Sequence, residues 1–437
     1  MKRYLWIFAV LPFLWSCIAE DRSACPQPRG VSVRMSVCPD PMTAVTHAAD
    51  EEAIRDLNLY LLDADRNVVL HRYQSSPTLR FECLPGDYLL RIAANMGRDT
   101  GDSPAWENLA VTHADDYDTL PMAYEGEVSI PSSDETVTLP TVEVQRVVVK
   151  VTYNISVAPD AGDIRLHSVQ PVNLPARMPV FDPGLRAAEY TAGEIVGSSS
   201  QTLTGTFYML PNLQGEVPSI ADQRDKGPAN APADATFLRI RALRGSKVLD
   251  YYIYPGGNNT SNFDIRANTH YRLDIMIRGD AEVDTRIRAY TVEVLCTPEA
   301  ALSNGFLLER QPMRLTLRLG GAYEETGVEA FVELKTGDVR YFGFEGQWGA
   351  VARTMEIRGP ENDYDIRYWP PSFTREECRF MFRVQILDRY GEVASFSFPY
   401  CYAHLLRVYT KWFDGSNGKG TVASREGVGV VEDVTLC

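Results

Sequence analysis

The chain has 437 residues, of which 45% are hydrophobic and 23% are charged, and its formal net charge is −15. The length allows about three domains, and the composition is that of a globular protein rather than a disordered one. Such an acidic chain shows no excess of the Lys and Arg that neutralise phosphates, so we expect no nucleic-acid partner.

The first sixteen residues have the features of an export signal. Lys2-Arg3 precede an apolar stretch from Tyr4 to Trp15, which is too short to span a bilayer by itself. The stretch ends in Leu14-Trp15-Ser16-Cys17, which resembles a bacterial lipobox. The resemblance implies acylation of Cys17 and attachment to outer-membrane lipid; the alternative is a plain secretory peptide that is cleaved nearby. The acidic pair Glu20-Asp21 resembles the surface-export signal of Bacteroidales lipoproteins.

Period-two alternation of apolar and polar residues dominates the rest of the chain and predicts strands that bury one face. The clearest runs cover residues 147–157, 271–277, 313–319 and 380–386. Turn-forming clusters of Gly, Pro, Asn and Asp separate such runs, as at 255–259, 320–321 and 414–418. Short strands, frequent turns and little helical periodicity predict an all-β chain of β-sandwiches.

Shifts in composition place the domain boundaries. We expect a lipid-anchor segment and linker at 17–41, after the signal peptide at 1–16. An N-terminal β-sandwich at 42–142 and a second β-sandwich at 143–283 follow. Residues 284–437 are expected to form a C-terminal β-domain, whose role the sequence does not indicate.

Several strings resemble the fimbrillin superfamily, which builds the pili of Bacteroidales, and are closest to its anchor and accessory lipoproteins. They occur in the order CIAEDRSACP at 17–26, LNLYLLD at 57–63, LPGDY at 84–88, RVVVK at 146–150, FYMLPN at 207–212, FDIRAN at 263–268 and DTR at 284–286. The resemblance implies tandem transthyretin-like β-sandwiches that join other pilin subunits by β-strand exchange. An unpaired sheet edge is a template for another strand, so this mode of assembly is physically reasonable.

The polymerising pilins of that family lose a leader after an arginine. Arg22 and Arg29 lie in the corresponding region. Because cleavage at either would detach the chain from a lipid on Cys17, we expect an anchor to keep its leader.

No catalytic set, metal site or cofactor motif emerges from the sequence. The six histidines are scattered without an i, i+4 pair, and no Cys-x-x-Cys occurs. The string at 415–421 lacks the glycine and hydroxyl positions of a phosphate-binding loop, so we interpret it as a turn. We therefore predict that the protein is not an enzyme. With Cys17 acylated, seven cysteines remain, so at least one stays free or pairs between molecules.

Two weaker features are candidate sites. Asp118-Thr119-Leu120 matches the short pattern at which Bacteroidales exported proteins are O-glycosylated, which makes Thr119 a candidate acceptor. The C-terminal domain is rich in aromatic residues, which either fill its core or bind a partner. The residues that we consider most exposed among them are Trp348, Trp369 and Trp412.

These observations predict a surface-exposed outer-membrane lipoprotein, tethered by Cys17, that is an anchor or accessory subunit of a fimbrillin-type pilus. The alternative is a stand-alone surface lipoprotein of the same fold that binds a glycan or a host protein through its C-terminal domain. The last residues, 427–437, alternate well enough to form a strand, which either closes the chain's own sandwich or is donated to a partner.

Overall fold

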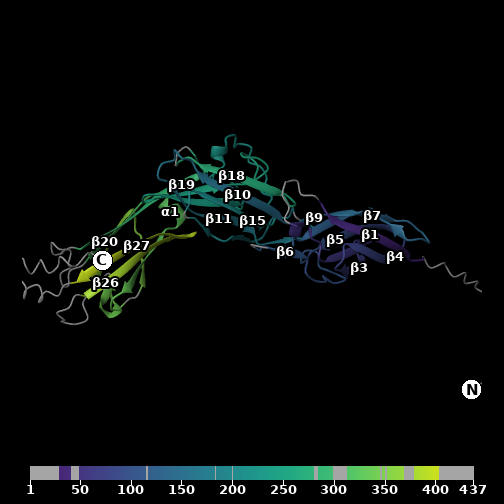
Figure 1. The fold of residues 1–437 in the computed structure, drawn as a ribbon, viewed down its shortest axis with the longest axis horizontal. Coiled ribbons are helices and arrows are strands. Elements are labelled where there is room, and N and C mark those ends of the chain that lie inside the picture. The colour runs from purple at the N-terminus through teal and green to yellow at the C-terminus, as the bar shows by residue number, and fades with distance from the viewer. Residues whose placement is uncertain are drawn as a thin grey trace, which may run out of the picture. The chain divides into compact units, whose positions relative to one another are not determined.

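A computed structural model describes residues 29–40, 49–114, 117–182, 184–198, 200–279, 284–298, 313–344, 347–349, 352–368 and 378–402. Strands dominate these residues, which confirms the predicted all-β fold (Figure 1). The chain forms two compact units. Among the described residues, the first comprises 29–40, 49–105 and 119–145, and the second comprises 106–114, 117–118 and those from 146 to 402.

The first unit contains one sheet with the strand order β3-β2-β5-β7-β9-β1-β4, in which β8 also pairs with β1. Alternating residues of β1 are buried, and β2 is buried along its whole length, so both contribute to the core. The elements are β1 (Val31–Pro39), η1 (Ala49–Glu52), β2 (Leu57–Leu62), β3 (Val68–Gln74), β4 (Thr78–Cys83), β5 (Gly86–Ala94), β7 (Met122–Ile130), β8 (Val137–Thr138) and β9 (Val142–Arg146).

The second unit begins with a sandwich. Its smaller sheet has the order β15-β10-β18, and it packs against β11, β16 and β17 of a ten-stranded sheet. Ile155 of β10, Ile240 of β16 and Leu249 of β17 are fully buried in the shared core. The elements are β6 (Ala110–Thr112), β10 (Val149–Val157), β11 (Arg165–Pro175), β12 (Arg177–Pro179), β13 (Tyr190–Ala192), β14 (Val196–Gly197), β15 (Thr202–Met209), η2 (Gln223–Asp225), β16 (Phe237–Arg244), β17 (Lys247–Ile253) and β18 (His270–Ile277).

The same ten-stranded sheet continues into a second sandwich within this unit. β19 pairs with β17 through residues 287–291 and with β20 through residues 290–298, so one strand belongs to both sandwiches. A four-stranded sheet of order β24-β21-β26-β27 covers the far part of the long sheet. The elements are β19 (Ile287–Pro298), β20 (Met313–Gly321), α1 (Tyr323–Thr326), β21 (Glu329–Thr336), η3 (Val339–Tyr341), β22 (Phe342–Phe344), β23 (Gln347–Trp348), β24 (Ala352–Met355), β25 (Glu361–Tyr368), β26 (Cys378–Asp388) and β27 (Gly391–Tyr402).

The alternating runs of the sequence become strands where they were expected. Residues 271–277 lie in β18, 313–319 in β20 and 380–386 in β26. Gly320 and Gly321 were expected in a turn but end β20, where Gly321 has a φ of 72°. The division into three domains stays a prediction, as does the role of the segment at 427–437, which lies outside the described residues.

Candidate functional site

The most prominent candidate site is the open edge of β18. β18 runs parallel to β10, from Lys150 opposite His270 to Val157 opposite Ile277. No other strand pairs with β18 within the described ranges. The three-stranded sheet of the first sandwich in this unit therefore ends at β18, which is an edge strand in the described part of the chain.

Two hydrogen bonds at the ends of β18 show which backbone groups point outward. Lys150 N–H donates to the Thr269 carbonyl (3.1 Å), and Ala158 N–H donates to the Ile277 carbonyl (2.8 Å). In a parallel pair, alternate residues direct both backbone groups to the same neighbour. The odd-numbered residues of β18 therefore bond to β10, and the backbone groups of Arg272, Asp274 and Met276 face the open edge.

The side chains of β18 divide in the same alternating way. Leu273 and Ile275 are half-buried against the core, and Ile277 is buried. Arg272, Asp274 and Met276 are exposed, and Met276 is 54% exposed although it is apolar. An added strand would thus meet outward-facing backbone groups and an apolar surface together.

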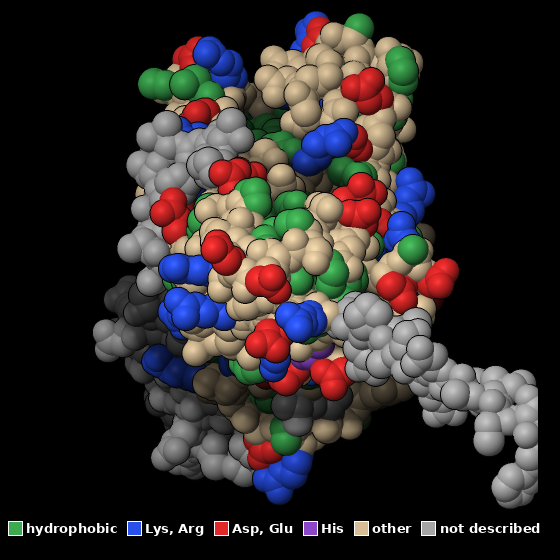
Figure 2. Space-filling view, turned by 90° about the vertical axis from the view of Figure 1, so that its right-hand side faces the viewer, with side chains coloured by type: hydrophobic (Ala, Val, Ile, Leu, Met, Phe, Trp, Pro, Cys, Tyr) green, Lys and Arg blue, Asp and Glu red, His purple; other side chains and the backbone are tan. Residues whose placement is uncertain are grey.

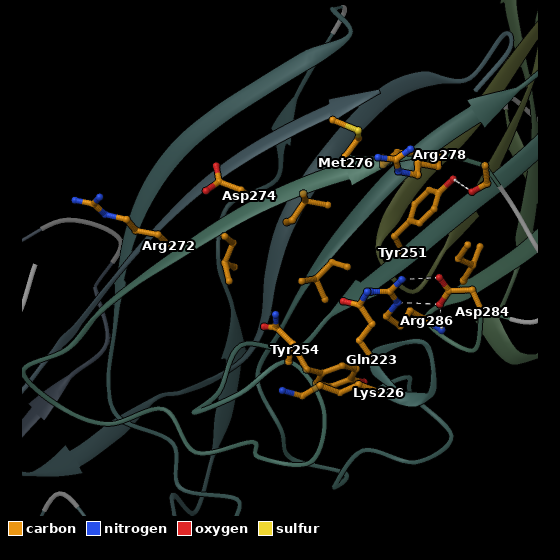
Figure 3. A pocket seen from close by; sticks show the side chains of 17 residues that line it. Gln223, Lys226, Tyr251, Tyr254, Arg272, Asp274, Met276, Arg278, Asp284 and Arg286 are labelled. Atoms are coloured by element: carbon orange, nitrogen blue, oxygen red, sulfur yellow. Dashed lines mark hydrogen bonds and ion pairs between the residues drawn. The ribbon is translucent and has the colours of Figure 1, made fainter. Parts of the chain in front are cut away.

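A groove of about 660 Å³ follows this edge. Its opposite wall consists of the end of β17 and of three further segments, around Lys226, Asn259 and Arg286, and Figure 3 shows side chains of this wall facing β18. The apolar lining comprises Tyr251, Ile253, Tyr254, Leu273, Ile275, Met276, Ile277 and Ile287, and the polar lining comprises Gln223, Lys226, Asn259, Arg272, Asp274, Arg278, Asp284 and Arg286.

An ion pair and two hydrogen bonds fix the wall that faces β18. Arg286 donates to both carboxylate oxygens of Asp284 (2.8 and 2.6 Å), and this bonding raises the pKa of Arg286. The Arg286 carbonyl accepts from Tyr252 N–H (2.8 Å), which continues the pairing between β17 and β19. Tyr251 Oη donates to the Gly279 carbonyl (2.8 Å), so this wall is bonded to the chain that follows β18 (Figure 3).

Lys226 anchors the loop at the other end of the groove. Its ammonium donates to the carbonyls of Asn258 (2.8 Å) and Asn262 (2.7 Å) and lies 4.8 Å from the centre of the Phe263 ring. The residue is only 3% exposed, and burial lowers its pKa to about 8. Lys226 is therefore a structural cation that joins two loops.

Close backbone packing holds the neighbouring residue in place. A Cβ atom on Gly227 would lie 2.2 Å from the Thr285 carbonyl oxygen. Thr285 N–H in turn donates to the Arg224 carbonyl (3.0 Å). Only glycine fits at position 227 unless the loop moves away from the groove wall.

The first unit offers no comparable edge at its N-terminal strand. β1 pairs with β4 on one side and with β8 and β9 on the other. Arg29, whose side chain is 91% exposed, lies just before β1. Cleavage after Arg29 would leave β1 in its sheet, so it would not open a groove there.

Figure 2 shows acidic and basic side chains interspersed on the face that it draws.

Of the residues singled out from the sequence, Thr119 and Trp348 are described by the structure, and neither lines the groove. Trp348 is 49% exposed on β23, where its indole packs over Gly343. Thr119 is half-buried. Cys17, Trp369 and Trp412 lie outside the described residues, so the roles assigned to all five stay predictions. Several other aromatic residues of the C-terminal part fill its core: Phe342, Phe344, Tyr364, Tyr368 and Tyr400.

The described residues also offer little reactive chemistry. They include no group of three or more His, Cys, Asp or Glu side chains that could hold a metal ion. Cys38, Cys83 and Cys296 are free thiols, and burial raises the pKa of Cys296 to about 11, which keeps it protonated. Nor does the described part contain a helix long and apolar enough to cross a membrane.

A domain of unknown function, DUF4906, matches residues 207–275, which run from β15 into β18. No curated protein matches the chain. Among solved structures, the chain is similar to fimbrial proteins.

The tip fimbrial protein Mfa3 from Porphyromonas gingivalis, with a C-terminal truncation, is 14% identical, with a TM-score of 0.42 over 60% of this chain and 98% of that one. A fimbrilin from the same organism is 13% identical, with a TM-score of 0.41 over 59% and 95%. A fimbrial assembly protein from Parabacteroides distasonis is 12% identical, with a TM-score of 0.36 over 60% and 95%.

Proposed function

We propose that the chain is an outer-membrane-anchored anchor or accessory subunit of a fimbrillin-type pilus, which joins a neighbouring subunit by β-strand complementation. The observation that carries this proposal is the open edge of β18 beside an apolar groove. The tether is Cys17, and the partner is a pilin subunit that supplies an extended segment.

The groove supports this proposal because it offers both parts of strand recognition. Outward backbone groups at 272, 274 and 276 supply hydrogen bonds along the length of an added strand. Leu273 and Ile275 are half-buried, so an added strand would cover apolar surface that now contacts water. Backbone bonding gives affinity, and the apolar lining selects a segment with alternating side chains.

A proline substitution at the β18 edge tests the proposal. Met276→Pro removes one outward N–H group and leaves the bonds to β10 in place, because proline is tolerated on an edge strand. We expect the variant to keep the far-UV circular dichroism of the wild type and to lose co-purification with pilins. Met276→Ala is the matched control, since it removes the same side chain but keeps the N–H group.

The tether is tested separately in cells. We expect Cys17→Ala to release the chain from the outer membrane, and we expect released or lengthened fibres in a strain that lacks the chain. Unchanged co-purification of the Met276→Pro variant with pilins would refute assembly at this edge. Mass spectrometry that finds the sulfur of Cys17 unmodified would refute the tether.

One observation favours the stand-alone binder as a second candidate. The indole of Trp348 is held against Gly343 with one face exposed, an arrangement suited to stacking on a sugar ring. If this function holds, the purified chain stays monomeric and binds a glycan array, and Trp348→Ala lowers that binding while Met276→Pro does not.

A further inference from the structure

The sheet of the first unit ends at β4, which is a second open edge. β4 pairs with β1 alone among the residues that the structure describes. Leu79 and Phe81 of this strand are buried in the core. Thr78, Arg80 and Glu82 alternate with them and are exposed. Such an edge can accept a further strand, and its exposed residues indicate which strand would fit.

The hydrogen bonds of β1 show which backbone groups of β4 face outward. Val37 N–H donates to the Pro77 carbonyl (2.9 Å), so this is a hydrogen-bonded position of the ladder between β1 and β4. In an antiparallel ladder, such positions alternate with positions whose backbone groups point away from the partner strand. Counted along the register, Phe81 is again a hydrogen-bonded position. The N–H and C=O groups of Arg80 and Glu82 therefore face the open edge.

The charges of this edge are not compensated within the described part of the chain. There, neither Arg80 nor Glu82 makes a side-chain hydrogen bond or an ion pair. The residue directly opposite Arg80 on β1 is Arg34, which is also exposed, and the residue opposite Glu82 is Ser32. Like charges directly opposite one another destabilise a sheet. An acidic side chain on an added strand would therefore compensate the positive charge at Arg80.

We infer that the added strand is β4 of a second copy of this chain, paired antiparallel about a twofold axis at Phe81. In that register Arg80 lies opposite Glu82 of the partner subunit, and Glu82 lies opposite the partner's Arg80. Both positions have outward backbone groups, so the two strands also exchange hydrogen bonds there. A contact of this kind uses the same surface of both copies and closes at a dimer.

Charge complementarity selects this register over its neighbours. A twofold axis at Arg80 would place the two arginines against each other, and an axis at Glu82 would do the same to the two glutamates. Charged residues on an edge strand ordinarily repel other strands. Here the two charges have opposite signs and are two residues apart, so they match the same strand in reverse. A second copy therefore fits this edge better than a strand without that spacing of charges.

The contact is small, since β4 has six residues, so we expect a weak dimer whose share rises with protein concentration. Chains tethered to one membrane would meet at a raised effective concentration, which favours such a contact. The pairing itself does not rest on the proposed function, because it involves neither β18 nor a pilin.

Charge reversal tests the inference. Sedimentation velocity is measured under reducing conditions on the full mature chain with Cys17→Ala, so that no lipid interferes. Arg80→Glu and Glu82→Arg each place like charges opposite one another and should weaken the dimer about tenfold. The double variant restores opposite charges in reversed order and should recover the wild-type dimer. Glu127→Arg is the matched control, because it makes the same change of charge on β7, an interior strand, and should leave association unchanged.

Hydrogen exchange tests the strand pairing itself. The amides of Arg80 and Glu82 should exchange more slowly in concentrated than in dilute protein. The amide of Phe81 is bonded to β1 and should exchange at the same rate in both. The same slowing should be absent from Arg80→Glu.

Three results would overturn the inference. The first is a chain that does not associate at concentrations up to about 1 mM. The second is a dimer that both single reversals leave unchanged, or that the double variant fails to restore, since its contact would lie elsewhere. The third is a dimer in which the amides of Arg80 and Glu82 exchange as fast as in the monomer, since no strands would be paired. None of these results depends on β18, so Met276→Pro tests the proposed function independently, and Arg80→Glu is the form in which the monomeric state of a stand-alone binder is measured.

Discussion

A buried ionic network joins the two sandwiches of the second unit, and Asp388→Asn is the sharpest test of its role. Asp388, at the end of β26, accepts from Arg241 and from Tyr290 Oη (2.8 Å), and Tyr390 N–H donates to its other oxygen (2.9 Å). Arg241 also donates to both oxygens of Asp250 (2.9 Å each). The side chains of Arg241, Asp250 and Asp388 are at most 1% exposed.

Charges in this network balance, and the substitution unbalances them. Arg239 and Arg241 face Asp250 and Asp388, so replacing one carboxylate leaves one uncompensated positive charge in the interior. Removing one partner of a buried ion pair costs about 3–5 kcal/mol. Asparagine keeps the shape and one acceptor for Tyr290 or Tyr390, so we expect a loss of about 3 kcal/mol.

Urea unfolding followed by tryptophan fluorescence and circular dichroism measures this loss. The control is Asp365→Asn, which breaks an exposed pair with Arg367 and should change stability by less than about 0.5 kcal/mol. The double variant Arg241→Met with Asp388→Asn restores neutrality, so its loss should be smaller than the sum of the two single losses. A single Asp388→Asn variant within 0.5 kcal/mol of the wild type, about the effect of a surface substitution, would refute the reasoning.

Three further predictions concern the groove wall and the network. Burial lowers the pKa of His167, and the positive charges of Arg241 and Arg239 lower it further, so the unfolded chain binds a proton at a higher pH than the folded chain does. The contribution of His167 to stability is therefore complete above about pH 6.5 and is lost as the pH falls below that value. We expect His167→Gln to remove this pH dependence from the midpoint of urea unfolding. Gly227→Ala should cost about 1–3 kcal/mol because its Cβ would meet the Thr285 carbonyl, whereas Gly359→Ala, with open space around it, should be tolerated in the same thermal melt. Lys226→Met should cost about 1–3 kcal/mol by leaving two carbonyls without their donor. Because the pKa of Lys226 falls from 10.5 to about 8 on folding, the wild type should also gain stability as the pH rises between these values, and the variant should lose that gain.

Local pattern explains why the strands were predictable and the site was not. The alternation at 271–277 requires a strand with one buried face, and β18 is that strand. Its position at the edge depends on parallel pairing with β10, about 120 residues earlier in the chain, which no local signal encodes. Lys226 is another example: a lysine in a polar loop predicts a solvated side chain, yet this one is buried because two distant carbonyls accept from it.

The buried ionic network also could not be predicted from local sequence patterns. Arg239, Arg241 and Asp250 look like the polar face of β16 and β17 in the sequence. They are buried because Asp388, at the end of β26, and Tyr390, in the turn that follows, cover that face; the Arg239 guanidinium lies 4.1 Å from the centre of the Tyr390 ring. A sequence pattern shows which residues share a face of a strand, but not which later segment covers that face.

The groove and the C-terminal sandwich are therefore connected through β17, β19 and the buried network. Tyr251 of β17 lines the groove, and its neighbour Asp250 lies in the network that the turn after β26 covers. The same wall contains Arg286 and Ile287, and Ile287 is the first residue of β19, the strand shared by both sandwiches. A chain that ends at residue 279 would lack the part of that wall formed by Asp284, Arg286 and Ile287, and it would expose two arginines and an aspartate that are now buried. We therefore expect it to bind strand peptides more weakly than the full chain, even though β18 itself is intact. Equal binding by the two chains would show that the C-terminal sandwich contributes nothing to the groove.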